Sequence, residues 1–275
     1  MYGVTGILFS IVLLLLAGAC AGFLGGLLGI GGGLPVVAAL SVVLPTLGIP
    51  RSSVMHVAVA TSLAAMVLTF TSSATAHIRR GSVLWPSWRR LAPGMVVGAL
   101  VGTHLAAFLP DFALRAVIGV FCLIMAGQMA IGRKAGAQAG EGERVPRSPW
   151  LMGAGAGIGT LSSVVGIGGG SMTVPLLVSL SARPVKAIGT SAVCGLMLAI
   201  VSALSYAVTV KVPTHALPWG TVGYVSLPVA ALIAMGSMSL APVGVRVAHK
   251  LSNRALKRIF ALFLVVMGLL IVLGG

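Results

Sequence analysis

Acidic residues are almost absent from this chain of 275 residues, which carries only Asp111, Glu141 and Glu143. Charged residues of both signs make up 8% of it, whereas about a quarter is usual for a soluble domain. So few charges cannot cover a water-facing surface, which excludes a soluble enzyme, a nucleic-acid-binding module and a disordered tail. Hydrophobic residues make up 58%, and no charge precedes Arg51. We therefore predict an all-α polytopic membrane protein.

Motifs for metals, nucleotides and catalysis are also missing. The three cysteines form no CxxC pair, and no two of the five histidines have a metal-binding spacing, so we expect no metal and no cofactor. No nucleotide loop and no GxSG-type segment is present, so we expect neither ATP-driven transport nor an enzyme. The three acids fall in predicted loops or at a helix start, which leaves no carboxylate in the membrane for a cation or for a proton relay. A cation transporter is therefore disfavoured.

Apolar runs predict ten helices in two sets of five. The first set comprises Val4–Leu28, Leu34–Leu47, Val54–Ala76, Leu91–Leu109 and Phe112–Ile131. The second comprises Trp150–Val165, Ser171–Leu180, Ala187–Val210, Val222–Val247 and Leu256–Leu273. We expect a first transmembrane repeat over residues 1–131, a cytoplasmic linker over 132–149 and a second transmembrane repeat over 150–275.

The two sets repeat one another in sequence. The segment GIGGG at 29–33 returns at 166–170, and LPDFALR at 109–115 returns as LSNRALK at 251–257. Between them, the Thr-Ser pair at 61–62 returns at 190–191. Three matches in the same order indicate an internal duplication.

The distribution of charge indicates that the repeats are inverted in the membrane. If the chain crosses ten times, every Lys and Arg except Arg51, Arg115 and Lys211 falls on one side. Cytoplasmic loops collect basic residues, so this side is predicted to be the cytoplasm and both termini are predicted to be periplasmic. Two parallel repeats would not explain why equivalent loops exchange their charge, whereas inverted repeats of five spans would.

The two GIGGG segments are the strongest candidates for a substrate site. Each interrupts an apolar run and precedes an unusually short span. Glycine lets a ligand approach the backbone closely, and the N–H groups at the start of the following helix can bind an anion. Paired breaks at corresponding positions are typical of transport sites, although glycines also serve close helix packing. The predicted substrate-binding residues here are Gly29, Gly31, Gly32, Gly33, Gly166, Gly168, Gly169, Gly170 and Ser171.

Hydroxyl groups and one histidine complete the predicted substrate site. Thr61 and Ser62, with Thr190 and Ser191, could donate hydrogen bonds to an oxyanion without bringing charge into the membrane. The alternative is that such a hydroxyl bonds back to a carbonyl of its own helix. His104 lies within an apolar span and is the best candidate for a proton-linked or substrate-bonding group, the alternative being a hydrogen-bonded structural histidine.

These motifs resemble the TauE/SafE family of membrane proteins, also called the toluene sulfonate uptake permease family. The resemblance is carried by residues 22–33, 60–63, 77–83, 157–175 and 189–191, and it covers essentially the whole chain. It implies a transporter in the bacterial inner membrane that exports or imports sulfite, sulfonates or other small anions.

The sequence thus predicts a secondary transporter of small sulfur-containing oxyanions, with the substrate bound at the interface of the repeats. The alternatives are a passive anion channel and a membrane subunit that docks a partner enzyme. Expected partners are the anion and the lipid bilayer, without nucleic acid. A homodimer is possible, because the pattern Gly94-x-x-x-Gly98-x-x-x-Gly102 suits a dimer contact as well as packing within one subunit.

Overall fold

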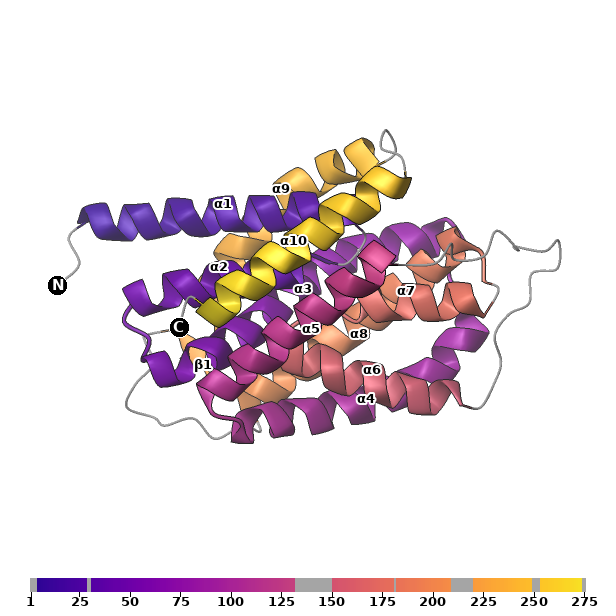
Figure 1. Ribbon diagram of the computed structural model, residues 1–275, viewed down its shortest axis with the longest axis horizontal. Coiled ribbons are helices and arrows are strands. Elements are labelled where there is room, and N and C mark those ends of the chain that lie inside the picture. The colour runs from indigo at the N-terminus through magenta and orange to yellow at the C-terminus, as the bar shows by residue number, and fades with distance from the viewer. Residues whose placement is uncertain are drawn as a thin grey trace.

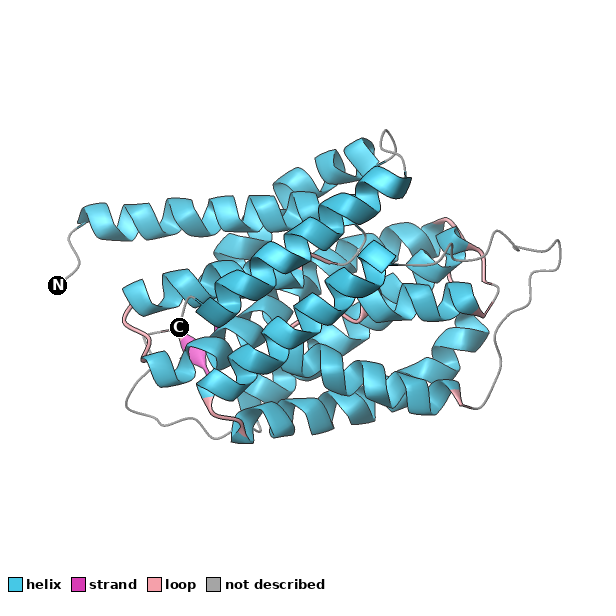
Figure 2. Cartoon of the chain, in the orientation of Figure 1, coloured by secondary structure: helices cyan, strands magenta, loops and turns pink. Residues whose placement is uncertain are grey.

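The computed structural model describes residues 4–28, 31–131, 150–180, 182–208, 220–248 and 253–273, and these segments form an assembly of helices (Figures 1 and 2). The first half contains α1 (Val4–Leu28), α2 (Gly33–Thr46), the short 3₁₀ helix η1 (Arg51–Ser53), α3 (Val54–Arg79), α4 (Trp85–Phe108) and α5 (Asp111–Ile131). The second contains α6 (Leu151–Val165), α7 (Gly170–Ser179), α8 (Pro184–Val208), β1 (Thr221–Val222), β2 (Val225–Ser226), α9 (Leu227–Ala248) and α10 (Asn253–Leu273). The all-helical prediction is confirmed, and the predicted linker 132–149 lies outside the described residues.

Helix lengths confirm the two predicted short helices. Among the described residues, the helical segments over 51–79, 85–108 and 185–208 are long and apolar enough to cross a membrane. By contrast, α2 has 14 residues and α7 has 10. At 1.5 Å per residue they extend only about 21 and 15 Å, which is shorter than the hydrocarbon core of a bilayer.

Two predicted boundaries are wrong. Helix α4 starts at Trp85 instead of Leu91, because Pro86 suits the first turn of a helix and the first turns also contain arginines that end the apolar run. The predicted start at Val222 is replaced by an antiparallel hairpin of β1 and β2, and α9 begins after it. Gly223 makes this turn with a φ of 58°. Strands of two residues are too short to produce an alternating pattern in the sequence.

Helices from the two halves pack against each other throughout the molecule. Along one edge in Figure 1, α1 lies beside α9, and along the opposite edge α4 lies beside α6. Between these edges, α5 packs on α10 and α3 packs on α8. Helix α3 is the most buried of the three membrane-length helices; it packs on α2, and its residues Met66 and Phe70 lie against Gly168, just before α7.

Glycines allow the two edge pairs to approach at backbone distance. A side chain on Gly94, Gly98 or Gly102 would overlap backbone atoms of α6. The same holds for Gly18 and Gly22 of α1 against α9. The glycine pattern of α4 therefore packs inside one subunit, and it is not available as a seam between two copies.

Candidate functional site

Both glycine-rich segments interrupt helices in the structure, as the sequence predicts. Gly32 precedes α2 with a φ of 73°, and Gly169 precedes α7 with a φ of 72°. Gly166 ends α6, again in the left-handed region, with a φ of 78°. Residues with a Cβ rarely adopt these angles, so glycine is required for the chain to turn here. A helix begins after Gly32 and another after Gly169, and the first N–H groups of each helix lack an intrahelical acceptor.

The two interruptions meet in the interior of the protein. Gly33 lies so close to the carbonyl oxygen of Gly166 that no side chain would fit between them. Ser62 of α3 stands beside this contact, and its hydroxyl donates to the carbonyls of Val59 at 2.8 Å and of Gly166 at 3.3 Å. The breaks, which are more than 130 residues apart in sequence, thus form a single central region alongside α3.

An aromatic ring fills the space beside both breaks. The ring of Phe70, on α3, occupies the position where a Cβ on Gly168 would lie, and it approaches the Cβ position of Gly31 to 2.5 Å. Met66, one turn earlier on α3, touches the same two glycines. Phe70 is only 3% exposed, and it packs against Gly195 of α8. The two side chains therefore close the centre of the protein.

Three buried hydroxyl groups around the second break have no hydrogen-bond partner within the described part of the chain. They belong to Ser162 of α6 and to Ser171 and Thr173 of α7. Ser162 and Thr173 are fully buried, and Ser171 is 8% exposed. The hydroxyl oxygen of Ser162 lies 3.6 Å from the Cβ position of Gly169, the residue that precedes α7. Since buried polar groups are normally bonded, the unpartnered hydroxyls near this break are suited to a polar ligand.

The predicted threonines of the site hold the backbone of distant loops. The oxygen of Thr61 accepts a hydrogen bond from the N–H of Ser226 at 3.1 Å. Thr190 accepts one from the N–H of Leu84 at 2.8 Å, and it donates to the carbonyl of Lys186 at 2.7 Å. The bonds from Ser226 and Leu84 give both threonines a structural role that sequence reasoning did not assign. The bond from Thr190 to Lys186 is the own-helix alternative that it did consider.

The remaining predicted residues fall in different places. Ser191 is buried on α8 next to Thr190. Gly29 lies outside the described residues. His104 is exposed on α4, where its Nδ1 bonds the carbonyl of Leu100 one turn earlier, and the structure does not bring it to the glycine breaks.

Sequence reasoning missed Phe70, Ser162 and Thr173. A signal existed for the two hydroxyl residues, since both lie within four positions of the second GIGGG segment. Phe70 gave none. The residue that stands in the same relation to Thr190-Ser191 as Phe70 does to Thr61-Ser62 is Ala199. Phe70 is therefore not part of the repeated pattern.

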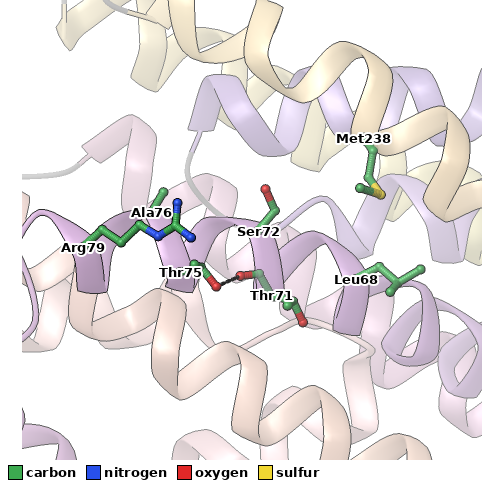
Figure 3. Close-up of a pocket in the computed structure, with 7 residues that line it drawn as sticks. All are labelled: Leu68, Thr71, Ser72, Thr75, Ala76, Arg79 and Met238. Carbon is green, nitrogen blue, oxygen red and sulfur yellow. Dashed lines mark hydrogen bonds between the residues drawn. The ribbon is translucent and has the colours of Figure 1, made fainter.

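A groove of about 470 Å³ runs along α3 where Met238 of α9 faces it (Figure 3). Its lining residues are Leu68, Thr71, Ser72, Thr75, Ala76, Arg79 and Met238. Positions two apart on a helix point in nearly opposite directions, so the Ser72 side of α3 faces away from the breaks that Phe70 contacts. The groove is separate from the candidate site. Within the described ranges, no cluster of three His, Cys, Asp or Glu side chains could hold a metal ion.

Comparison with known proteins gives full-length matches. The family model described as sulfite exporter TauE/SafE matches residues 14–271. A probable membrane transporter protein of Haemophilus influenzae is 34% identical over 263 residues, which is 95% of this chain and 98% of the relative. A probable membrane transporter protein of Methanocaldococcus jannaschii is 27% identical over 267 residues, 97% of each chain. The probable membrane transporter protein YunE of Bacillus subtilis is 22% identical, covering 97% of this chain and 98% of its own. No solved structure matches.

Proposed function

Because the chain belongs to the TauE/SafE sulfite exporter family, whose members are multi-pass membrane transporters and not enzymes, we propose that it is a secondary transporter of small sulfur-containing oxyanions. Sulfite and small sulfonates are the substrates that the family description and the site chemistry favour. The transporter lies in the bacterial inner membrane with both termini in the periplasm, as the distribution of basic residues favours.

The unpartnered hydroxyls around the second break carry the proposal for the substrate site. An oxyanion at the N-terminus of α7 would accept hydrogen bonds from Ser162 and from either Ser171 or Thr173, which point to nearly opposite sides of α7; all three hydroxyls are buried without a partner in the described structure. The N–H groups of the first turn of α7 and the positive end of its dipole favour the same charge. This arrangement binds an anion without a buried lysine or arginine.

The first break lacks this set of hydroxyls. The positions that the sequence repeat pairs with Ser162, Ser171 and Thr173 are Gly25, Leu34 and Val36. The substrate is therefore bound chiefly by the second half of the chain, and the first half supplies the wall formed by Met66 and Phe70.

The closed centre favours a transporter over a passive channel. Phe70 and Met66 fill the space between the breaks, so an anion passes only when α3 moves relative to α2 and α7. Such a movement suits alternating access between the two halves of the chain.

The pattern of helix contacts supports two repeats related by a two-fold exchange as the basis of that movement, and the charge distribution favours their inversion. Exchanging the first five helices with the last five converts the pair α1–α9 into α6–α4, and the structure contains both pairs. The pairs α5–α10 and α3–α8 each convert into themselves. The hydrogen bonds from Ser226 to Thr61 and from Leu84 to Thr190 likewise form an exchanged pair.

Counterflow of labelled sulfite and sulfonates in proteoliposomes tests the function, and two neighbouring serines test the site. Ser162→Ala should weaken substrate affinity roughly tenfold to hundredfold, because a hydrogen bond to a charged group is worth about 1.5–3 kcal/mol. Its thermal stability should not fall, since the hydroxyl makes no bond in the described structure.

Ser163→Ala is the matched control. The Ser163 hydroxyl donates to the carbonyl of Gly159 at 2.8 Å and lies 2.7 Å from the Ser202 hydroxyl. Its removal should lower stability and leave affinity unchanged. If Ser162→Ala transports and binds sulfite as the unmodified protein does, the anion site is not at the second break. If no anion shows counterflow, the function itself is wrong.

A further inference from the structure

A buried group of ionisable side chains lies away from the glycine breaks, where the first turn of α3 meets the start of α5. Asp111 is the first residue of α5, and its Oδ2 accepts a hydrogen bond from the Nε of Arg115 at 2.8 Å. Its Oδ1 accepts another from the backbone N–H of Met55 at 2.7 Å. The side chains of Asp111 and Arg115 are only 10% and 11% exposed. A carboxylate expected at a helix start is thus buried and paired.

His56 completes this group, and its hydrogen bonds define which ring nitrogen carries the proton. Nε2 lies 3.0 Å from the carbonyl oxygen of Ala106 and 3.1 Å from that of Leu109. Carbonyl oxygens only accept, so Nε2 must be the donor. In the neutral ring, Nδ1 is consequently an unprotonated acceptor. It is buried, has no hydrogen-bond partner within the described residues, and lies 4.0 Å from the Oδ1 of Asp111.

This geometry prepares Nδ1 for a proton. A proton on Nδ1 would point to a carboxylate that already stands across from it, and a small shift would convert the 4.0 Å separation into a charge-assisted hydrogen bond. Within the described residues, the charged or titratable groups beside the ring are Asp111 of α5, which Arg115 pairs with, and Tyr224, which stacks on the ring with centroids 5.1 Å apart. Arg51, on the preceding η1, is exposed.

The stacked tyrosine connects this group to the rest of the protein. Tyr224 lies in the turn between β1 and β2, and two residues later the N–H of Ser226 donates to Thr61 of α3. Helix α9 starts immediately after Ser226. His56 of α3 thus contacts, through Tyr224, the hairpin that precedes α9.

We propose that His56 Nδ1, facing Asp111, is the binding site for a proton that moves with the substrate. The inference rests on the proposed transport function and names its coupling ion. The positions that the sequence repeat pairs with His56 and Asp111 are Val185 and Asn253, neither of which titrates. The second repeat therefore has no equivalent of this pair at the matching positions.

The experiment measures proton and substrate movement separately in proteoliposomes. The substrate is an alkyl sulfonate, which keeps its charge between about pH 5.5 and 8, the range in which histidine titrates. A sulfonate gradient should drive a pH change in the lumen with the unmodified protein. With His56→Gln, which retains an N–H for the two carbonyls but binds no proton, that pH change should fall at least tenfold. Sulfonate counterflow, which needs no net proton movement, should stay within about twofold.

Asp111→Asn provides a second, independent readout. Its amide oxygen can still accept from Met55, but a protonated ring would face Arg115 without a counter-charge. The lumenal pH change driven by the sulfonate gradient should therefore fall at least tenfold, while sulfonate counterflow should stay within about twofold. His104→Gln is the control, because that exposed histidine bonds the carbonyl of Leu100 in its own helix, and neither proton movement nor counterflow should change.

The outcomes separate the two proposals. If the unmodified protein shows sulfonate counterflow without any pH change, the proton site is wrong and the transport function stands. Proton movement that persists undiminished in His56→Gln or in Asp111→Asn also overturns the site. If neither sulfonate nor sulfite shows counterflow, the transport function fails first.

Discussion

Thr61 accepts a hydrogen bond from the backbone N–H of Ser226, which joins the middle of α3 to the residue before α9. Thr190 of α8 and Leu84, the residue before α4, form the corresponding contact. In both cases the acceptor belongs to a Thr-Ser pair and the donor precedes a helix with proline at its second position. The duplicated Thr-Ser pair is thus explained by the positioning of helix starts in the opposite half of the chain.

We expect Thr61→Val and Thr190→Val to destabilise the protein. Each leaves a buried N–H without an acceptor, which costs about 1–3 kcal/mol. Thermal unfolding in detergent measures the effect. Thr61→Ser and Thr190→Ser keep the oxygen and should lose less than half as much stability. Equal losses for serine and valine at either position would contradict the hydrogen-bonding role.

The loss of stability caused by Gly168→Ala should be smaller when Phe70 is also replaced by alanine. Gly168→Ala places a methyl group where the Phe70 ring lies, and overpacking of this kind costs about 1–3 kcal/mol. Phe70→Ala removes the obstacle, so in the double variant the added methyl should cost less than half of what it costs alone. A double-mutant cycle of melting temperatures measures this coupling.

Gly153→Ala is the control for the added methyl group. Gly153 also lies in a helix, α6, but nothing is within 4 Å of its Cβ position. Alanine there should be neutral or slightly stabilising, because it lowers the entropy of the unfolded chain. Strict additivity of Gly168→Ala and Phe70→Ala would show that the ring does not fill the glycine site.

The glycines of α4 should affect folding rather than association. Gly98→Ala forces α4 and α6 apart, since its methyl group would meet the backbone of Ala156. We expect a loss of about 1–3 kcal/mol and an unchanged oligomeric state in light scattering. The matched control, Gly157→Ala on the exposed side of α6, should change neither property. A variant of Gly98 that melts normally but changes its oligomeric state would instead favour a dimer seam.

Sequence reasoning found the helices and the glycine breaks because both follow local rules. Apolar runs predicted all ten helices, and GIGGG marked two places where a helix cannot continue. The contacts between them depend on tertiary structure. Nothing in the sequence around Phe70 says that its ring reaches Gly168 across the molecule. Asp111 is an intermediate case: the spacing Asp111-x-x-x-Arg115 is typical of a helical ion pair, but its burial against His56 follows only from the packing of α5 on α3.

The orientation in the membrane is testable at the two ends of one helix. Ser52 and Arg80 are exposed and flank α3. The basic residues near Arg80 predict that this end faces the cytoplasm, and Ser52 should therefore face the periplasm. In a variant without native cysteines, a membrane-impermeant maleimide should label Ser52→Cys in intact spheroplasts and label Arg80→Cys only in inside-out vesicles. The opposite result would place the arginine-rich loops outside. The orientation predicted for the other helices would then also be reversed, because each follows from the orientation of α3 along the chain.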